Sequence, residues 1–140
     1  MIPNPTHRRY EASDVLGLNR PVTVEMVKEG FDTSVINALS QYLAISQSEL
    51  LQYLGISNRT YARRKIQRRL SVEESDQVWR LGSMTAKAMG LFRDREAASF
   101  WLRRPAPALN GELPLDLSST SIGAMEVEQL IGRLEHGIPT

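Results

Sequence analysis

The sequence predicts an all-α protein in which a helix-turn-helix domain is continuous with a small C-terminal helical region. Apolar side chains recur at helical spacing in several segments, and capping signatures precede these segments while glycines follow them. Residues 57–70 carry six cationic and no acidic side chains, directly after a shorter helical segment and a glycine. With 140 residues, of which 41% are hydrophobic, the chain is about the size of one ordinary domain.

The N-terminal segment, residues 1–20, is expected to form an arm, because it lacks steady periodicity and contains prolines and a glycine. A short helix is predicted over residues 23–29. It ends at Gly30, since a residue without Cβ tolerates the left-handed conformation that ends helices. Asp32, Thr33 or Ser34 then caps the next helix. The buried stripe of that helix consists of Val35, Ile36, Leu39, Tyr42 and Leu43.

Two capping boxes fix the starts of the next helices. In residues 46–49, Ser-Gln-Ser-Glu, the serine hydroxyl can accept from the third amide while the glutamate reaches back to the serine amide. The helix that begins there ends at Gly55, and Ser57 caps the basic helix that follows. Residues 71–74, Ser-Val-Glu-Glu, form the second box and open a longer helix that is predicted to run to about Gly90.

The C-terminal region begins with a short helix capped by Asp94, and then the composition changes. Residues 103–114 contain three prolines and an Asn-Gly turn signal, which predicts an extended strap rather than a helix. Thr120 starts the last helix, and Gly137 ends it. The apolar stripe of this helix consists of Val127, Leu130, Ile131 and Leu134. We therefore divide the chain into the arm, a helix-turn-helix domain over residues 21–92 and a C-terminal domain over residues 93–140.

The basic helix indicates DNA binding, because a capped helix, a glycine turn and a second helix with polar residues at its start are what entry into the major groove requires. Arginine can chelate guanine and asparagine can pair with adenine, so base reading is assigned to the first two turns. Arg64 stands three residues after Tyr61, and we expect it either to contact DNA or to be half-buried against an acid. The predicted DNA-binding residues are Ser57, Asn58, Arg59, Thr60 and Arg63, with Arg68 and Arg69 along the phosphate backbone.

Composition argues against an enzyme, a metal site and a membrane protein. The chain has no cysteine and two histidines, His7 and His136, at opposite ends. It has neither a catalytic constellation nor a glycine-rich phosphate loop, so we assign no reaction and no cofactor. His136 fits a cation at a helix C-terminus. We expect a cytoplasmic protein, because no apolar run approaches the roughly 18 residues of a membrane span and the first residues do not resemble an export signal.

A series of residues in the C-terminal third carries a family resemblance. The series is Trp101, Leu102, Pro105, Leu109, Gly111, Pro114, Leu115, Leu117, Thr120, Gly123, Val127, Leu130, Arg133, Leu134, His136 and Gly137. It resembles the toxin-binding domain of the Xre/MbcA/ParS antitoxins. The upstream residues Arg59, Thr60, Tyr61, Arg63, Arg64, Leu70, Ser71, Glu74 and Ser75 are similar to the Xre-like region of that family. The resemblance covers residues 21–138, and it departs at Tyr61 and at residues 118–119.

This resemblance implies the antitoxin of a type II toxin-antitoxin system, which neutralises a toxin and represses its own operon. In this family the usual toxin has a RES domain and depletes NAD⁺, so the antitoxin itself would use no NAD⁺. Residues 105–140 carry five acidic side chains and one basic side chain, a balance that can steer them to a basic toxin cleft. We expect residues 128–140 to cover the substrate entrance of the toxin. The predicted toxin-binding residues are Leu113, Leu115, Glu128, Glu135, His136 and Ile138.

A homodimer is expected, because one short recognition helix reads few bases and a two-fold pair reaches half-sites about 34 Å apart. Two other functions remain open at this stage. A stand-alone dimeric helix-turn-helix transcription regulator would use the same basic helix, and its C-terminal region would serve dimerisation or a small effector. A protein-binding adaptor would keep the fold without binding DNA.

Overall fold

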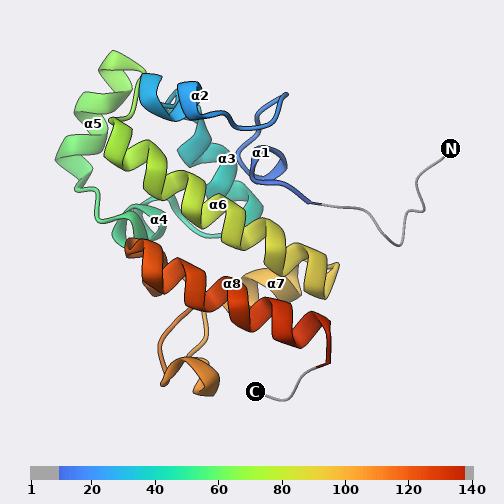
Figure 1. Cartoon of the computed structure of the whole chain (residues 1–140). Coiled ribbons are helices and arrows are strands. Elements are labelled where there is room, and N and C mark those ends of the chain that lie inside the picture. Colours follow the sequence, from blue (N-terminus) through green and yellow to red (C-terminus); the bar gives the residue numbers. More distant parts are fainter. Residues whose placement is uncertain (1–9, 138–140) are drawn as a thin grey trace, which may run out of the picture.

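The computed structural model describes residues 10–137, and this part of the chain is built from helices (Figure 1). The α-helices are α1 (Ala12–Val15), α2 (Val24–Glu29), α3 (Ser34–Leu43), α4 (Gln47–Leu54), α5 (Asn58–Gln67), α6 (Val72–Phe92), α7 (Arg95–Leu102) and α8 (Ser121–Glu135). Two 3₁₀ helices, η2 (Pro107–Leu109) and η3 (Asp116–Ser119), lie between α7 and α8. Within residues 10–137 the only β-type pairing is an isolated antiparallel bridge between Ala106 and Glu112. The predicted all-α class is confirmed.

The long helix α6 is the centre of the fold. It packs against α1, α2, α3, α4, α7, α8 and η3. In Figure 1, α2 and α8 flank α6 on opposite sides, and α5 lies at the end of α6 where that helix begins. Val78, Leu81, Met84 and Ala88 are completely buried along its length. Both predicted domains therefore share one helix and one hydrophobic core.

The predicted helix starts are confirmed at most positions. Ser57, Asp94 and Thr120 each accept a backbone hydrogen bond at the start of α5, α7 and α8. Residues 71–74 form the complete capping box. At residues 46–49 the Ser46 hydroxyl accepts from the Glu49 N–H, but the reciprocal bond from the Ser46 N–H to the Glu49 carboxylate is not formed. The helix α6 also continues past the predicted end at Gly90 to Phe92, where Arg93 takes a left-handed conformation with φ of 57°.

The prediction of an arm over residues 1–20 is wrong for its second half. Residues 12–15 form α1, and Val15 and Leu16 are each only 1% exposed. Leu16 packs directly on α6 at Gly82, where an added Cβ would lie 3.2 Å from its side chain. A single helical turn is too short to show helical periodicity in the sequence, which explains the error. Residues 1–9 lie outside the described part of the chain.

The strap after α7 is folded onto the core, as its alternating leucines indicated. It is more compact than the extended chain we predicted, because Pro107–Leu109 form the 3₁₀ helix η2 between the two residues of the bridge. The Leu115 N–H donates to the Leu102 carbonyl at 3.1 Å. The Arg80 guanidinium of α6 donates to the Ser118 carbonyl at 3.2 Å, which fixes η3 against the central helix.

The last helix packs on α6 through the predicted stripe. Val127, Leu130 and Ile131 are buried, whereas Leu134, the last residue of the stripe, is 37% exposed. The start of α8 approaches η3 so closely that a Cβ at Gly123 would lie 2.2 Å from the Leu117 carbonyl oxygen. Among residues 10–137, no helix combines the length and the apolar content that crossing a membrane requires.

Candidate functional site

The two helices α4 and α5 form a helix-turn-helix unit whose turn is fixed by local hydrogen bonds. Gly55 ends α4 in the left-handed conformation, with φ of 66°. The Ser57 hydroxyl oxygen accepts from the Thr60 N–H at 3.0 Å and donates to the Thr60 hydroxyl at 3.0 Å. Leu50, Leu51 and Leu54 of α4 are buried. The turn thus leaves the start of α5 at the surface, where its first backbone N–H groups favour an anion.

The outer face of α5 is polar and basic. Tyr61 is the one buried residue of this helix. The side chains of Asn58, Arg59 and Arg63 are exposed. Arg59 and Arg63 stand four residues apart and therefore lie on the same side of the helix. The predicted base-reading residues are therefore accessible to a partner on the outer face of α5.

Arg64, the cation that stood out in the sequence, pairs with Glu74 of α6. Its Nε donates to Glu74 Oε1 at 2.8 Å, and its Nη2 donates to Oε2 at 3.3 Å. Burial alone would raise the pKa of the Glu74 carboxyl, but the bonds from Arg64 and from the Ser71 N–H outweigh burial and lower this pKa. Arg64 therefore anchors the recognition helix, which is the structural one of the two roles considered for it.

Arg68 and Arg69, both predicted to follow phosphates, differ in their surroundings. Arg68 closes α5 in a left-handed conformation, with φ of 58°. The Arg69 guanidinium donates to the Glu29 carbonyl at 2.7 Å, and next to it the Leu70 N–H donates to the Phe31 carbonyl at 2.9 Å. These bonds tie the end of the basic segment to the turn after α2, so part of the Arg69 guanidinium serves the fold. A phosphate contact by either arginine remains a prediction.

Two residues predicted to bind toxin lie on the strap in different environments. Leu115 is 0% exposed, so in this structure it belongs to the core and cannot touch a partner directly. The reason is its backbone bond to α7, which draws the strap against the core. Leu113 is half-buried. It lines a pocket between α4 and the strap, so it is accessible to a partner.

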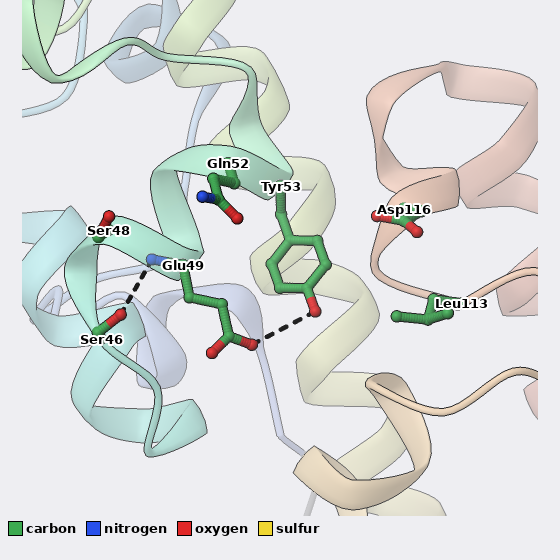
Figure 2. Close-up of a pocket in the computed structure, with 7 residues that line it drawn as sticks. All are labelled: Ser46, Ser48, Glu49, Gln52, Tyr53, Leu113 and Asp116. Carbon is green, nitrogen blue, oxygen red and sulfur yellow. Dashed lines mark hydrogen bonds between the residues drawn. The ribbon is translucent and has the colours of Figure 1, made fainter.

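Figure 2 shows this pocket, which lies between α4, the first helix of the helix-turn-helix unit, and the C-terminal region. Its lining residues are Ser46, Ser48, Glu49, Gln52, Tyr53, Leu113 and Asp116. The Tyr53 hydroxyl donates to Glu49 Oε2 at 3.4 Å. Burial raises the pKa of this tyrosine, and the neighbouring carboxylates of Glu49 and Asp116 raise it further. The pocket is therefore lined by one carboxylate from α4 and one from η3, and Arg103 pairs with that of Glu49 at 3.9 Å.

The predicted toxin-binding residues of α8 also differ from one another. Glu128 Oε1 accepts from the Ser83 hydroxyl at 3.2 Å and pairs with Lys87 Nζ at 3.0 Å, so it joins α8 to α6. Glu135 and His136 are exposed at the end of the helix, where His136 occupies the C-cap position. Ile138 lies outside the described residues. The structure therefore groups Glu135 and His136 and places Leu113 on another side of the region, next to α4.

Two exposed apolar features of the molecule were not predicted from the sequence. Ile66 is the large hydrophobic residue of α5 that is exposed on the outer side of this helix. A surface groove in the C-terminal region is lined by Trp101, Arg104, Pro105, Ala106, Pro107, Ala108, Leu130 and Leu134. Ile66 was recognisable as an apolar residue seven positions after Arg59. The groove was not, because it combines α7, the strap and α8.

The described residues hold no group of histidines, cysteines and carboxylates that could bind a metal ion. Comparison with known proteins instead points to binding functions. Residues 23–82 match the antitoxin Xre-like helix-turn-helix domain, and residues 87–137 match the antitoxin Xre/MbcA/ParS C-terminal toxin-binding domain. The two matches meet within α6, ahead of the boundary that we had placed at residue 92.

Individual proteins agree with these matches. The chain is 36% identical over 119 residues to the antitoxin Xre of Yersinia enterocolitica, with 84% of this chain and 80% of the relative covered. It is 30% identical over 115 residues to the antitoxin Xre of Photorhabdus laumondii, with 81% of this chain and 78% of the relative covered. It is 24% identical over 124 residues to a Sphingobium protein named Prs ADP-ribosylating antitoxin, with 81% of this chain and 78% of that protein covered. With its helix-turn-helix unit, its C-terminal toxin-binding domain and these relatives, the chain belongs to the Xre antitoxin family.

Proposed function

We propose that the protein is the antitoxin of a type II toxin-antitoxin system, which neutralises its toxin and represses its own operon. The observation that carries the proposal is that both regions are attached to the same helix, α6. On one side α4 packs against α6 and α5 is tied to it by the pair of Arg64 and Glu74, and on the other α7, η3 and α8 pack against it. One chain with a shared core thus carries a basic helix for DNA and a separate surface for the toxin. In this role the protein is a regulator and not an enzyme.

We further propose that the toxin has a RES domain and consumes NAD⁺. The resemblance to the Xre/MbcA/ParS family is the main support. The name of the Sphingobium relative, which contains the words ADP-ribosylating, is compatible with it because NAD⁺ is the usual donor of ADP-ribose. The antitoxin then needs no cofactor of its own. Because the protein would act on an NAD⁺-consuming toxin and on its own operator DNA, we propose that it works in the cytoplasm.

Neutralisation is proposed to occur by coverage of the toxin's active site. Residues 105–140 carry five acidic side chains and one basic side chain. A toxin cleft that accepts the phosphates of NAD⁺ is expected to be basic, so the two surfaces attract each other over a distance of about a Debye length. Glu135 and His136 at the exposed end of α8 are proposed as one contact, and Leu113 at the pocket beside α4 is proposed as a second, separate contact. Leu115 supports the strap from the core, and Glu128 holds α8 on α6.

Repression is proposed to use a homodimer. The outer face of α5 spans few base pairs, and a two-fold pair of recognition helices would double the contacts and set the half-site spacing at about 34 Å. Mass measurement in solution, by light scattering of the purified chain alone, tests this part of the proposal. A monomer at the concentrations that bind operator DNA would exclude the two-fold arrangement.

Co-expression with the protein encoded by the adjacent gene tests the function as a whole. An antitoxin is expected to copurify with that protein, to restore growth and to shift DNA from upstream of its own gene in electrophoresis. A stand-alone transcription regulator would shift the same DNA but would neither copurify with a toxin nor protect cells. An adaptor without DNA binding would copurify and leave the DNA unshifted.

A further inference from the structure

The recognition helix carries an apolar side chain that the fold does not use. Ile66 is 86% exposed, more than any of the other large hydrophobic residues that are exposed in residues 10–137. It lies in the last turn of α5, between the exposed residues Lys65 and Gln67. Since an isoleucine in this position gains nothing from the core, its side chain is available to a partner of α5.

The position of Ile66 on the helix identifies that partner. Arg59, Ala62, Arg63 and Ile66 stand at i, i+3, i+4 and i+7, so they form one stripe along the helix. All four are exposed, and the buried Tyr61 lies on the other side. In the homeodomain type of helix-turn-helix, the base-reading residues of the recognition helix recur at this same spacing. Ile66 therefore shares its face with the two arginines predicted to read bases.

The chemistry of the major groove supplies an apolar target. Among the four bases, thymine alone presents a methyl group on the floor of the groove, and apolar side chains contact it there. Arg59 and Arg63 suit guanine on the same face. We propose that Ile66 is a specificity-determining residue that packs against the 5-methyl group of a thymine in each operator half-site. This inference rests on the proposed DNA binding.

The anchoring of α5 supports a fixed role for Ile66. The Arg64 guanidinium is held by Glu74 on the inner side of the helix, two residues before Ile66. The chain after α5 is fixed by the bond from the Leu70 N–H to the Phe31 carbonyl at 2.9 Å. The helix cannot rotate about its axis without breaking these bonds, so Ile66 keeps the same outward direction as Arg63. A fixed direction is what discrimination by one methyl group requires.

The test compares thymine with uracil, which lacks the methyl group. Duplexes bound by the full chain are first selected from a random-sequence library, and each thymine of the selected site is then replaced by deoxyuridine. Affinities are measured for the wild type, for Ile66→Ala and for a matched control, Ile122→Ala. Ile122 is also an exposed isoleucine, 67% exposed, but it lies on α8 and outside the helix-turn-helix unit.

For the wild type and the Ile122→Ala control, we expect uracil at one position of a single half-site to weaken binding by about fourfold, the effect of one buried methyl group. For Ile66→Ala, we expect weaker binding to the thymine site and no difference between thymine and uracil at that position. The variant is expected to fold normally, because the side chain that it shortens is exposed.

Three outcomes would overturn the inference, and they are distinguishable. If the thymine-to-uracil difference persists in Ile66→Ala, another residue reads the methyl group. If Ile66→Ala weakens both sites equally and changes the mass of the free protein, Ile66 serves contacts between copies of the chain. If even the wild type selects no sequence, sequence-specific DNA binding itself is contradicted, and the role of Ile66 with it.

Discussion

Arg64 of the recognition helix and Glu74 of the central helix form a two-pronged ion pair, with the Arg64 Nε 2.8 Å from Glu74 Oε1. The same carboxylate accepts from the Ser71 N–H at 2.8 Å, where it completes the capping box of α6. One acidic side chain thus starts the central helix and holds the basic one. Tyr61 is the only residue of α5 that is buried, so this pair is a main attachment of the recognition helix.

Replacement of Glu74 by glutamine tests this attachment. The substitution removes the charge that two hydrogen-bond donors face, so we expect the free energy of unfolding to fall by about 2 kcal/mol. Operator affinity should fall as well, because α5 is held less firmly. Urea unfolding and a gel-shift titration measure the two effects. Glu73→Gln is the matched control, since Glu73 is exposed in the same turn, and an equal loss for the control would contradict the attachment.

The same pair makes stability depend on pH in a defined direction. The Glu74 carboxyl has a folded pKa below its ordinary value of 4.5, so its ionised form stabilises the fold above that pH. As the pH falls through the folded pKa, the carboxyl takes up a proton and this contribution is lost. The stability difference between the wild type and Glu74→Gln should therefore shrink as the pH falls from 6 to 3.

Unfolding titrations of both proteins at several pH values measure this change. Asp32 also has a lowered pKa, mainly because of its hydrogen bond from the Ser34 backbone N–H. It is present in both proteins, so the difference between them isolates Glu74. A difference that stays constant over this pH range would show that the charge of Glu74 does not stabilise the fold.

Substitutions of Arg68 and Arg69 are expected to have different effects, one on DNA binding and the other on stability. Arg69 donates to the Glu29 carbonyl, so Arg69→Gln is expected to lower the free energy of unfolding by about 1 kcal/mol. Arg68→Gln should leave stability unchanged and reduce the slope of log affinity against log salt concentration by about 1, the effect of one lost phosphate contact. Salt titrations and urea unfolding of the two variants give both quantities. A loss of stability in Arg68→Gln and a smaller salt slope in Arg69→Gln would instead give Arg68 the structural role and Arg69 the phosphate contact.

Substitutions of Leu113 and Leu115 are also expected to differ, the first acting mainly on toxin binding and the second on stability. Leu115→Ala opens a cavity in the core and is expected to cost about 2–5 kcal/mol, because this side chain is completely buried. Leu113→Ala is expected to cost less stability and to weaken toxin binding, because Leu113 is half-buried at a pocket. Calorimetry of the toxin complex and thermal unfolding distinguish the two variants. Undiminished toxin affinity in Leu113→Ala would remove it from the proposed contact.

Arg59→Ala together with Arg63→Ala should separate the two functions of the chain. Both side chains are exposed on α5, so the double variant is expected to fold normally and to bind the toxin like the wild type. Sequence-specific binding to operator DNA should be lost. A retained specific gel shift at moderate salt would refute the assignment of these arginines as base readers. Asn58 and the remaining basic residues would then have to account for specificity.

Local signals made much of the fold predictable from the sequence. A capping serine or threonine and its helix lie within a few residues of each other, so Ser57, the box at residues 71–74 and Thr120 were readable directly. The helical distance of Arg64 from Tyr61 also raised an acidic partner as one of two roles for Arg64, and the pair with Glu74 decided between them. The single turn of α1 offered no such signal, because its burial depends on contact with α6 far along the chain.

The candidate sites were less predictable, because their decisive contacts are distant in sequence. Arg69 bonds to a carbonyl 40 residues away, and no pattern in the basic segment reveals that partner. Glu128 meets Ser83 across 45 residues, so a charge that looked free for the toxin joins two helices. Leu113 and Leu115 alternate with other residues, and this pattern does not indicate which of the two leucines faces the core. Only the fold of the strap decides that Leu115 is the buried one.

The central claim is that this chain neutralises an NAD⁺-consuming toxin with the end of its C-terminal region. The most direct test measures NAD⁺ over time with the purified toxin of the adjacent gene, alone, with the full chain, and with a chain that lacks residues 135–140. We predict that the full chain stops NAD⁺ loss and that the shortened chain, although still bound to operator DNA, does not. Equal protection by both chains would contradict coverage of the active site by this end, and no protection by either would contradict the antitoxin function against that toxin.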